Sequence, residues 1–223
     1  ICVVLGDETA ETAIAVADAS ELTVVLQLAD RDALTQARKK VYEKGLLGTR
    51  IFIHHREKSR ISIADNIADM LIAAGDAAAI PREEALRVIQ PGARAFLGTE
   101  TVLTKPVPEG VDDWSHPCHG PDNNSQTDDT VAKAPYLTQF LAEPYYAPLP
   151  QMTVAAGGRI FRTLGHIAFK EREERWTNKL VAYNGYNGTE LWSQDIVPGI
   201  MVHRNTLAAS EDILYYADNT SCK

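Results

Sequence analysis

The first half of the chain alternates short apolar runs with amphipathic ones. The runs ICVVLG, LTVVLQLA, RIFIHH, ADMLIAAG and ARAFLG are bounded by turn residues, and the first two are rich in β-branched side chains, as buried parallel strands are. Between them, residues 31–48 place apolar side chains at helical spacing and end at glycines. Strands joined by right-handed helical crossovers form an open parallel sheet with a crevice at their carboxyl ends. The pattern therefore predicts an α/β unit with a five-stranded parallel sheet.

The fifth strand is predicted to end the sheet. Residues 81–92 read as a helix, with Pro81 in its first turn and Pro91-Gly92 beyond its end. After the strand ARAFLG, the stretch TETVLTKPVPEGVDDW is rich in Pro, Gly and charge, which is the composition of a linker. We therefore expect no further strand at that edge.

From residue 114 onward the helical period disappears. The polar stretch DDWSHPCHGPDNNSQTDDT is followed by short β runs in MTVAAGGRIF, LVAYNGYNGTELW and LAASEDILYYAD, each broken by turn residues. In the second of these, Gly188 permits the positive φ of a tight turn. The pattern predicts an α/β domain at 1–105, a connector at 106–150 and an all-β domain at 151–223.

Composition narrows the functional classes. The 223 residues carry a formal net charge of −8, and an acidic surface repels the phosphates of nucleic acids, so no nucleic-acid partner is predicted. No apolar run approaches the ~20 residues of a membrane span. The three cysteines are widely spaced, which fits neither a zinc site nor a disulfide framework, although one bridge remains open. Because the chain begins inside a strand-like run, we expect it to be part of a longer protein.

Two segments resemble class I S-adenosylmethionine-dependent methyltransferases. These are SIADNIADMLIAAG at 62–75 and, more closely, LRVIQPGARAFLG at 86–98. With the opening strand and loop, the resemblance covers residues 1–98. It implies a Rossmann-like fold, S-adenosylmethionine as cofactor and methyl transfer as the reaction. No catalytic residue is predicted, because methyl transfer depends mainly on positioning.

The same resemblance implies four cofactor-binding residues. Gly6 occupies one position of the family's glycine-rich loop, while Glu8 and Ala10 stand where the family has its other glycines. At the end of the second strand, where the family has an acid that holds the ribose hydroxyls, this chain has Leu28, flanked by Gln27, which can hydrogen-bond a hydroxyl; Asp30 follows two residues later. Glu57 follows the third strand and matches an acidic position near the adenine. The alternative for the loop is a helix start capped by Asp7 or Thr9.

The second half resembles pyrroloquinoline-quinone (PQQ)-type β-propellers. In LVAYNGYNGTELW, Ala182, Asn184, Gly188 and Trp192 match the repeat signature, which implies a strand, a turn and a Trp that packs between blades. The fragment would hold one blade and the start of the next. DDWSHPCHGPDNN resembles the connector of bacterial, planctomycete-type proteins that fuse a methyltransferase-like domain to such a propeller, which implies an exported parent protein.

Three functions follow as alternatives. The chain is a methyltransferase, a non-catalytic propeller scaffold that binds a ligand or partner, or part of a PQQ-dependent dehydrogenase. The cluster His116, Cys118 and His119 is interpreted as a connector loop rather than a metal site. The charged run 169–178 is interpreted as a solvated loop or a recognition surface. The aromatics Tyr145, Tyr146 and Trp176 are interpreted as residues that pack between the two domains or stack on a sugar.

Overall fold

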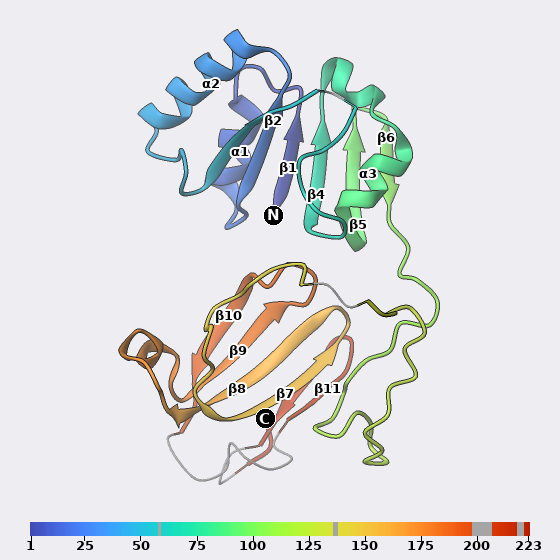
Figure 1. The fold of residues 1–223 in the computed structure, drawn as a ribbon, viewed down its shortest axis with the longest axis vertical. Helices are drawn as coiled ribbons and strands as arrows, with labels where there is room; N and C mark the ends of the chain where they lie inside the picture. The colour runs from blue at the N-terminus through green and yellow to red at the C-terminus, as the bar shows by residue number, and fades with distance from the viewer. Residues whose placement is uncertain (58, 136–137, 198–206, 218–220) are drawn as a thin grey trace. The chain divides into compact units, whose positions relative to one another are not determined.

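The structure is a computed structural model that describes residues 1–57, 59–135, 138–197, 207–217 and 221–223. The chain divides into two compact units, Ile1–Val107 and Pro108–Lys223, which are described separately below (Figure 1). Within the described residues, no helix combines the length and the apolar character needed to span a bilayer.

The first unit is built on a six-stranded mixed sheet with the order β3-β2-β1-β4-β5-β6. Its five parallel strands are β1 (Cys2–Leu5), β2 (Val24–Leu28), β3 (Ile51–His55), β4 (Ala68–Ala73) and β5 (Ile89–Leu97). The five predicted parallel strands are confirmed. Because β1 pairs with both β2 and β4, the strand order reverses at β1, which is the arrangement of a Rossmann-like fold.

Helices cover both faces of this sheet. Helices α1 (Glu11–Ala19) and α2 (Arg31–Glu43) pack on one face, and the 3₁₀ helix η1 (Gly75–Ala79) and α3 (Arg82–Val88) pack on the other. Successive residues of β1 therefore enter opposite cores: Val4 packs with α1 and α2, whereas Val3 packs with η1 and α3. Burial on both faces explains why β1 reads as a continuous apolar run.

The predicted end of the sheet at the fifth strand is wrong. Residues Thr101–Thr104, interpreted as linker, form a sixth strand, β6, that pairs antiparallel with β5 from Leu97↔Thr101 to Arg94↔Thr104. Only Leu103 of this strand is buried, because β6 is the edge of the sheet. A four-residue edge strand with one buried side chain gives too short a pattern to distinguish it from a linker.

The predicted break between helix and strand at Pro91-Gly92 is also wrong. Helix α3 ends at Val88 and β5 begins at the next residue, so Pro91 and Gly92 lie inside the strand. The pairing of β5 with β4 jumps from Ala68↔Ile89 to Met70↔Arg94, which leaves extra residues on the β5 side. Gly92 has φ +81°, so the Pro-Gly pair forms a bulge in the strand.

The second unit is all-β, as predicted. Strands β7 (Leu149–Ala156), β8 (Arg159–Ile167), β9 (Lys179–Asn184) and β10 (Glu190–Asp195) form an antiparallel meander, and β11 (Leu207–Ala209) pairs with β12 (Leu214–Tyr216). Gly188 has φ +72° in the turn between β9 and β10, which confirms its predicted turn role. Trp192 is 41% exposed, and its ring lies 6.2 Å from that of Phe161.

The charged run at 169–178 is not simply a solvated loop. Residues Glu171–Trp176 form a 3₁₀ helix, η2, between β8 and β9. Two of its side chains, Glu173 and Trp176, are buried. The sequence could not predict this burial, because it does not show which residues of a charged run are covered by another segment of the chain.

The turn after β1 passes very close to the end of β4. Gly6 has φ +74°, and a Cβ at this position would lie 2.4 Å from the carbonyl oxygen of Ala74 and 2.9 Å from the Cβ of Ala77. Gly45, after α2, has a similar φ of +72°, but a Cβ there would meet nothing within 4 Å. Substituting Gly45 therefore measures the cost of the positive φ alone, whereas substituting Gly6 adds the cost of a steric clash.

We expect Gly6→Ala to destabilise the protein more than Gly45→Ala. The positive φ costs each variant roughly 1–2 kcal/mol. The clash with Ala74 adds about 1–3 kcal/mol for Gly6→Ala alone. Urea denaturation, monitored by circular dichroism, measures the difference, and equal losses of unfolding free energy would contradict the close contact.

Candidate functional site

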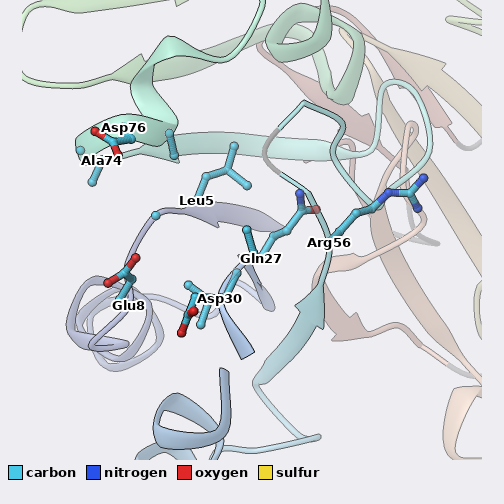
Figure 2. Close-up of a pocket in the computed structure, with 12 residues that line it drawn as sticks. Leu5, Glu8, Gln27, Asp30, Arg56, Ala74 and Asp76 are labelled. Atoms are coloured by element: carbon cyan, nitrogen blue, oxygen red, sulfur yellow. The ribbon is translucent and has the colours of Figure 1, made fainter. Parts of the chain in front are cut away.

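A cavity of about 510 Å³ lies at the carboxyl ends of β1, β2 and β4, where the strand order reverses (Figure 2). Ligands of open α/β sheets bind in this crevice. The volume falls within the ~300–1,000 Å³ of small-molecule sites. The lining residues are Leu5, Gly6, Glu8, Gln27, Leu28, Ala29, Asp30, Arg56, Ala74, Gly75, Asp76 and Ala77.

The charged groups of the cavity are mostly acidic. Glu8 follows β1, Asp30 follows β2 and Asp76 follows β4, and all three are exposed to solvent at the opening. Arg56 follows β3 and is the cation among the lining residues. Figure 2 shows the Arg56 side chain extending away from the three carboxylates. The cavity therefore presents a negative field to an entering ligand.

Asp7 occupies the amino-terminal end of α1. Its carboxylate is buried and accepts hydrogen bonds from the backbone N–H of Glu11 at 3.2 Å and of Ala13 at 2.9 Å. The Thr9 hydroxyl also donates to it, at 3.3 Å. This confirms that Asp7 caps the helix. Because a carboxylate already satisfies these N–H groups, they cannot hold the phosphate that dinucleotide-binding folds place at this helix end.

Gln27, predicted to hold a ribose, makes hydrogen bonds to the loop after β3. Its amide nitrogen donates to the carbonyl oxygens of Arg60 at 2.8 Å and Glu57 at 3.2 Å, and its amide oxygen accepts from the N–H of Ser62 at 2.9 Å. Both amide hydrogens are therefore used, and the side chain is buried. Gln27 lines the cavity but acts by positioning the segment after β3.

The structure brings three of the four predicted cofactor residues together. Gly6, Glu8 and Gln27 line the cavity, whereas the Glu57 side chain is exposed and is not among the lining residues. Arg56, its neighbour in the sequence, is among the lining residues.

Asp30 and Asp76 are lining residues that sequence reasoning did not select. Asp30 was noted two residues beyond the expected position, and it also accepts a hydrogen bond from the Ala33 N–H at 2.7 Å as the cap of α2. Asp76 lies in the first turn of η1, directly after β4. An acid two or three residues after the end of a buried strand was the signal that could have identified both.

The histidines and cysteine of the connector form a hydrogen-bonded loop. His119 Nε2 lies 2.7 Å from the Asp112 carboxylate, and the backbones of His116 and His119 pair with each other. Among the described residues, no group of three His, Cys, Asp or Glu side chains is placed to hold a metal ion. All three cysteines, Cys2, Cys118 and Cys222, are free thiols in the structure.

The first unit has a Rossmann-like fold with a cavity at the carboxyl ends of its strands, and an antiparallel β unit follows it in the chain. No protein-family model matches the chain, and no curated protein matches it. Solved structures match 42% of the chain. They include a candidate S-adenosyl-L-methionine-dependent methyltransferase of Methanococcus maripaludis (22% identity, TM-score 0.39), the [4+2]-cyclase SpnF (20%, 0.39) and a SAM-dependent methyltransferase of Aquifex aeolicus (19%, 0.38).

These matches span 45%, 36% and 53% of the respective structures, so the chain shares about half of their length or less. Their TM-scores are too low to carry a functional conclusion.

Replacing Gln27 by Leu is expected to lower the free energy of unfolding by about 2 kcal/mol, because three backbone groups lose their partner. Gln36→Leu, on the exposed face of α2, is the matched control and is expected to have little effect. Chemical denaturation compares the two variants. Hydrogen exchange should also quicken at Ser62 in Gln27→Leu alone; identical behaviour of both variants would show that the loop does not depend on Gln27.

The contact between His119 and Asp112 is expected to depend on pH. The hydrogen bond to Asp112 raises the pKa of His119, and bonds from Thr127 and Asp128 lower the pKa of Asp112. The stabilising contribution of protonated His119 is complete below its unfolded pKa, near 6.5, and is lost as pH rises through the raised folded pKa. Asp112 contributes above its own unfolded pKa and loses this contribution as pH falls through the lowered folded pKa.

An NMR titration of the histidine ring protons measures this shift. In Asp112→Asn the midpoint of His119 should move back toward 6.5, whereas Asp122→Asn, in the same loop, should leave it raised. A His119 midpoint that is the same in all three proteins would contradict the pairing.

Proposed function

We propose that residues 1–107 bind S-adenosylmethionine and form a methyltransferase-like domain. The observation that carries the proposal is the acidic cavity at the point where the strand order reverses, lined by Glu8, Asp30 and Asp76. The resemblance of residues 62–75 and 86–98 to the class I methyltransferases supports the same cofactor.

The charge of the cavity favours this cofactor over phosphate-bearing nucleotides. S-adenosylmethionine has a sulfonium and an ammonium group against one carboxylate and has no phosphate, so a negative field attracts it. Nucleotide phosphates would face the three carboxylates, and Asp7 already occupies the helix amides that would otherwise bind them. The carboxylates that line the cavity therefore suit a cationic nucleoside.

Each lining residue has a role that its chemistry allows. Asp30 follows β2 and offers a carboxylate that accepts hydrogen bonds from the ribose hydroxyls. Gly6 lets the backbone of the first loop lie against β4 without a side chain between them. Glu8 and Asp76 place negative charge on the side of the cavity formed after β1 and β4, where it attracts the cationic methionine part. When bound, the cofactor supplies an electrophilic methyl group.

For the second unit, we propose the scaffold of a PQQ-like β-propeller blade. The sequential meander β7-β8-β9-β10 is the four-stranded unit from which propellers are built, and the β11-β12 hairpin follows it in the chain. The matching positions Ala182, Asn184 and Gly188 lie at the end of β9 and in the following turn. This proposal concerns the scaffold, and assigns no quinone ligand to the described residues.

Calorimetric titration of the 223-residue chain tests the cofactor proposal. S-adenosylmethionine is expected to bind with a dissociation constant on the order of micromolar, and ADP at least tenfold more weakly, roughly the effect of 1.4 kcal/mol. Asp30→Asn keeps a good helix cap but removes the charge, so it should weaken S-adenosylmethionine binding about tenfold.

Asp32→Asn is the control, because it removes an equal charge from an exposed position on α2 outside the cavity. It should leave the affinity unchanged. Binding of S-adenosylmethionine without methyl turnover would favour the non-catalytic alternative. Silence up to millimolar cofactor, or tighter binding of ADP, would overturn the proposal.

A further inference from the structure

A second, smaller cavity of about 190 Å³ lies within the β unit. It is formed between the chain segment before β7 and the 3₁₀ helix η2. Its lining residues are Glu143, Pro144, Tyr145, Arg172, Glu173, Arg175 and Trp176. Because drug-sized ligands occupy roughly 300–1,000 Å³, this cavity has room for a head group rather than for a whole cofactor.

The cavity contains a buried negative charge. Glu173 is 2% exposed although it lies in a highly charged run, and its carboxylate accepts a hydrogen bond from Arg172 Nε at 3.0 Å. A carboxylate withdrawn from water needs a cationic or hydrogen-bonding partner. The Arg172 side chain that supplies this partner is itself 62% exposed. The Glu173 carboxylate is therefore enclosed by the protein, whereas the Arg172 side chain lies largely in solvent.

Aromatic rings lie beside both arginines of the cavity, Arg172 and Arg175. The guanidinium carbon of Arg172 lies 5.9 Å from the centre of the Tyr145 ring and 5.8 Å from that of Tyr146. Arg175 lies 5.2 Å from the centre of the Trp176 ring and pairs with Glu143. These distances are those of cation–π contacts. Two side chains of the protein thus already hold positive charge over the rings.

The Tyr rings that hold Arg172 are open to solvent. Tyr145 is 58% and Tyr146 is 56% exposed, whereas Trp176 is buried. Because the Arg172 guanidinium is largely in solvent, another cation can exchange with it over the tyrosine faces, and Glu173 then keeps a cationic neighbour. A quaternary ammonium group is suited to this position, since it cannot donate hydrogen bonds and depends on aromatic faces and nearby negative charge.

We propose that this cavity is a binding site for quaternary ammonium groups and that Arg172 is its internal competitor. Tyr145 lines the cavity and Tyr146 lies beside it against Arg172; these two rings supply the aromatic faces, and Glu173 supplies the charge. The guanidinium of Arg172 occupies the site until a ligand cation replaces it.

Titration with choline tests the proposal, and 3,3-dimethylbutan-1-ol, its uncharged isostere, is the ligand control. NMR signals of the Trp176 indole and the tyrosine rings report binding to the full chain. We expect choline to bind with a dissociation constant on the order of millimolar and the isostere about tenfold more weakly. Arg172→Ala should tighten choline binding about tenfold, because the competitor is removed, whereas Arg82→Ala, an exposed arginine of the α/β unit, should not.

Two further variants test the site from the other side. Glu173→Gln should weaken choline binding and not binding of the isostere. Tyr145→Leu changes an exposed ring, so it keeps the test valid if Glu173→Gln fails to fold, and it should also weaken choline binding. Equal binding of choline and its isostere, or no gain in Arg172→Ala, would overturn the proposal.

Discussion

The close approach of Gly6 to the backbone of Ala74 is the constraint on which the candidate site depends. Parallel pairing of β1 with β4 brings the two strand ends together, and a turn without a side chain lets their loops meet. Glu8 and Asp76, which are 68 positions apart in the sequence, line one cavity as a result. A bulky residue at position 6 would separate these loops, and the crevice would lose one of its walls.

Electrostatics then limits what the crevice can bind. In a fold whose helix ends often attract phosphate, this chain places the Asp7 carboxylate on the helix amides and three more carboxylates around the cavity. The backbone arrangement of a Rossmann-like fold is retained, but the field at its strand ends is negative. This sign is the reason for proposing a cationic nucleoside as the ligand.

The β unit shows the same principle on a smaller scale. Glu173 is buried in a charged helical turn and is balanced by an arginine that remains exposed. Around that arginine lie aromatic rings that hold cations without hydrogen bonds. In the α/β unit an excess of carboxylates limits the ligands that can be expected, whereas in the β unit the two acids of the cavity are balanced by Arg172 and Arg175, so a ligand cation has to exchange with an arginine.

The sequence by itself determined the two architectures. The strands β1 to β5, the helix α2 and the hairpins of the β unit were predicted because burial imposes a regular spacing on apolar side chains and glycines. Edge strand β6 and the bulge at Pro91-Gly92 were missed, since few of their side chains are buried and pairing with a neighbour decides their conformation. These elements have little periodicity to read.

The candidate site was predicted only in part, for a related reason. Gly6 and Glu8 were selected because they follow a recognisable strand, and both line the cavity. Only the tertiary structure decided that Gln27 forms hydrogen bonds with the loop after β3 and that the Glu57 side chain faces solvent. It also decided that Asp30 and Asp76 line the same cavity. Strand spacing depends on neighbours in the chain, whereas the partner of a polar side chain depends on which distant segments the fold brings within hydrogen-bonding distance.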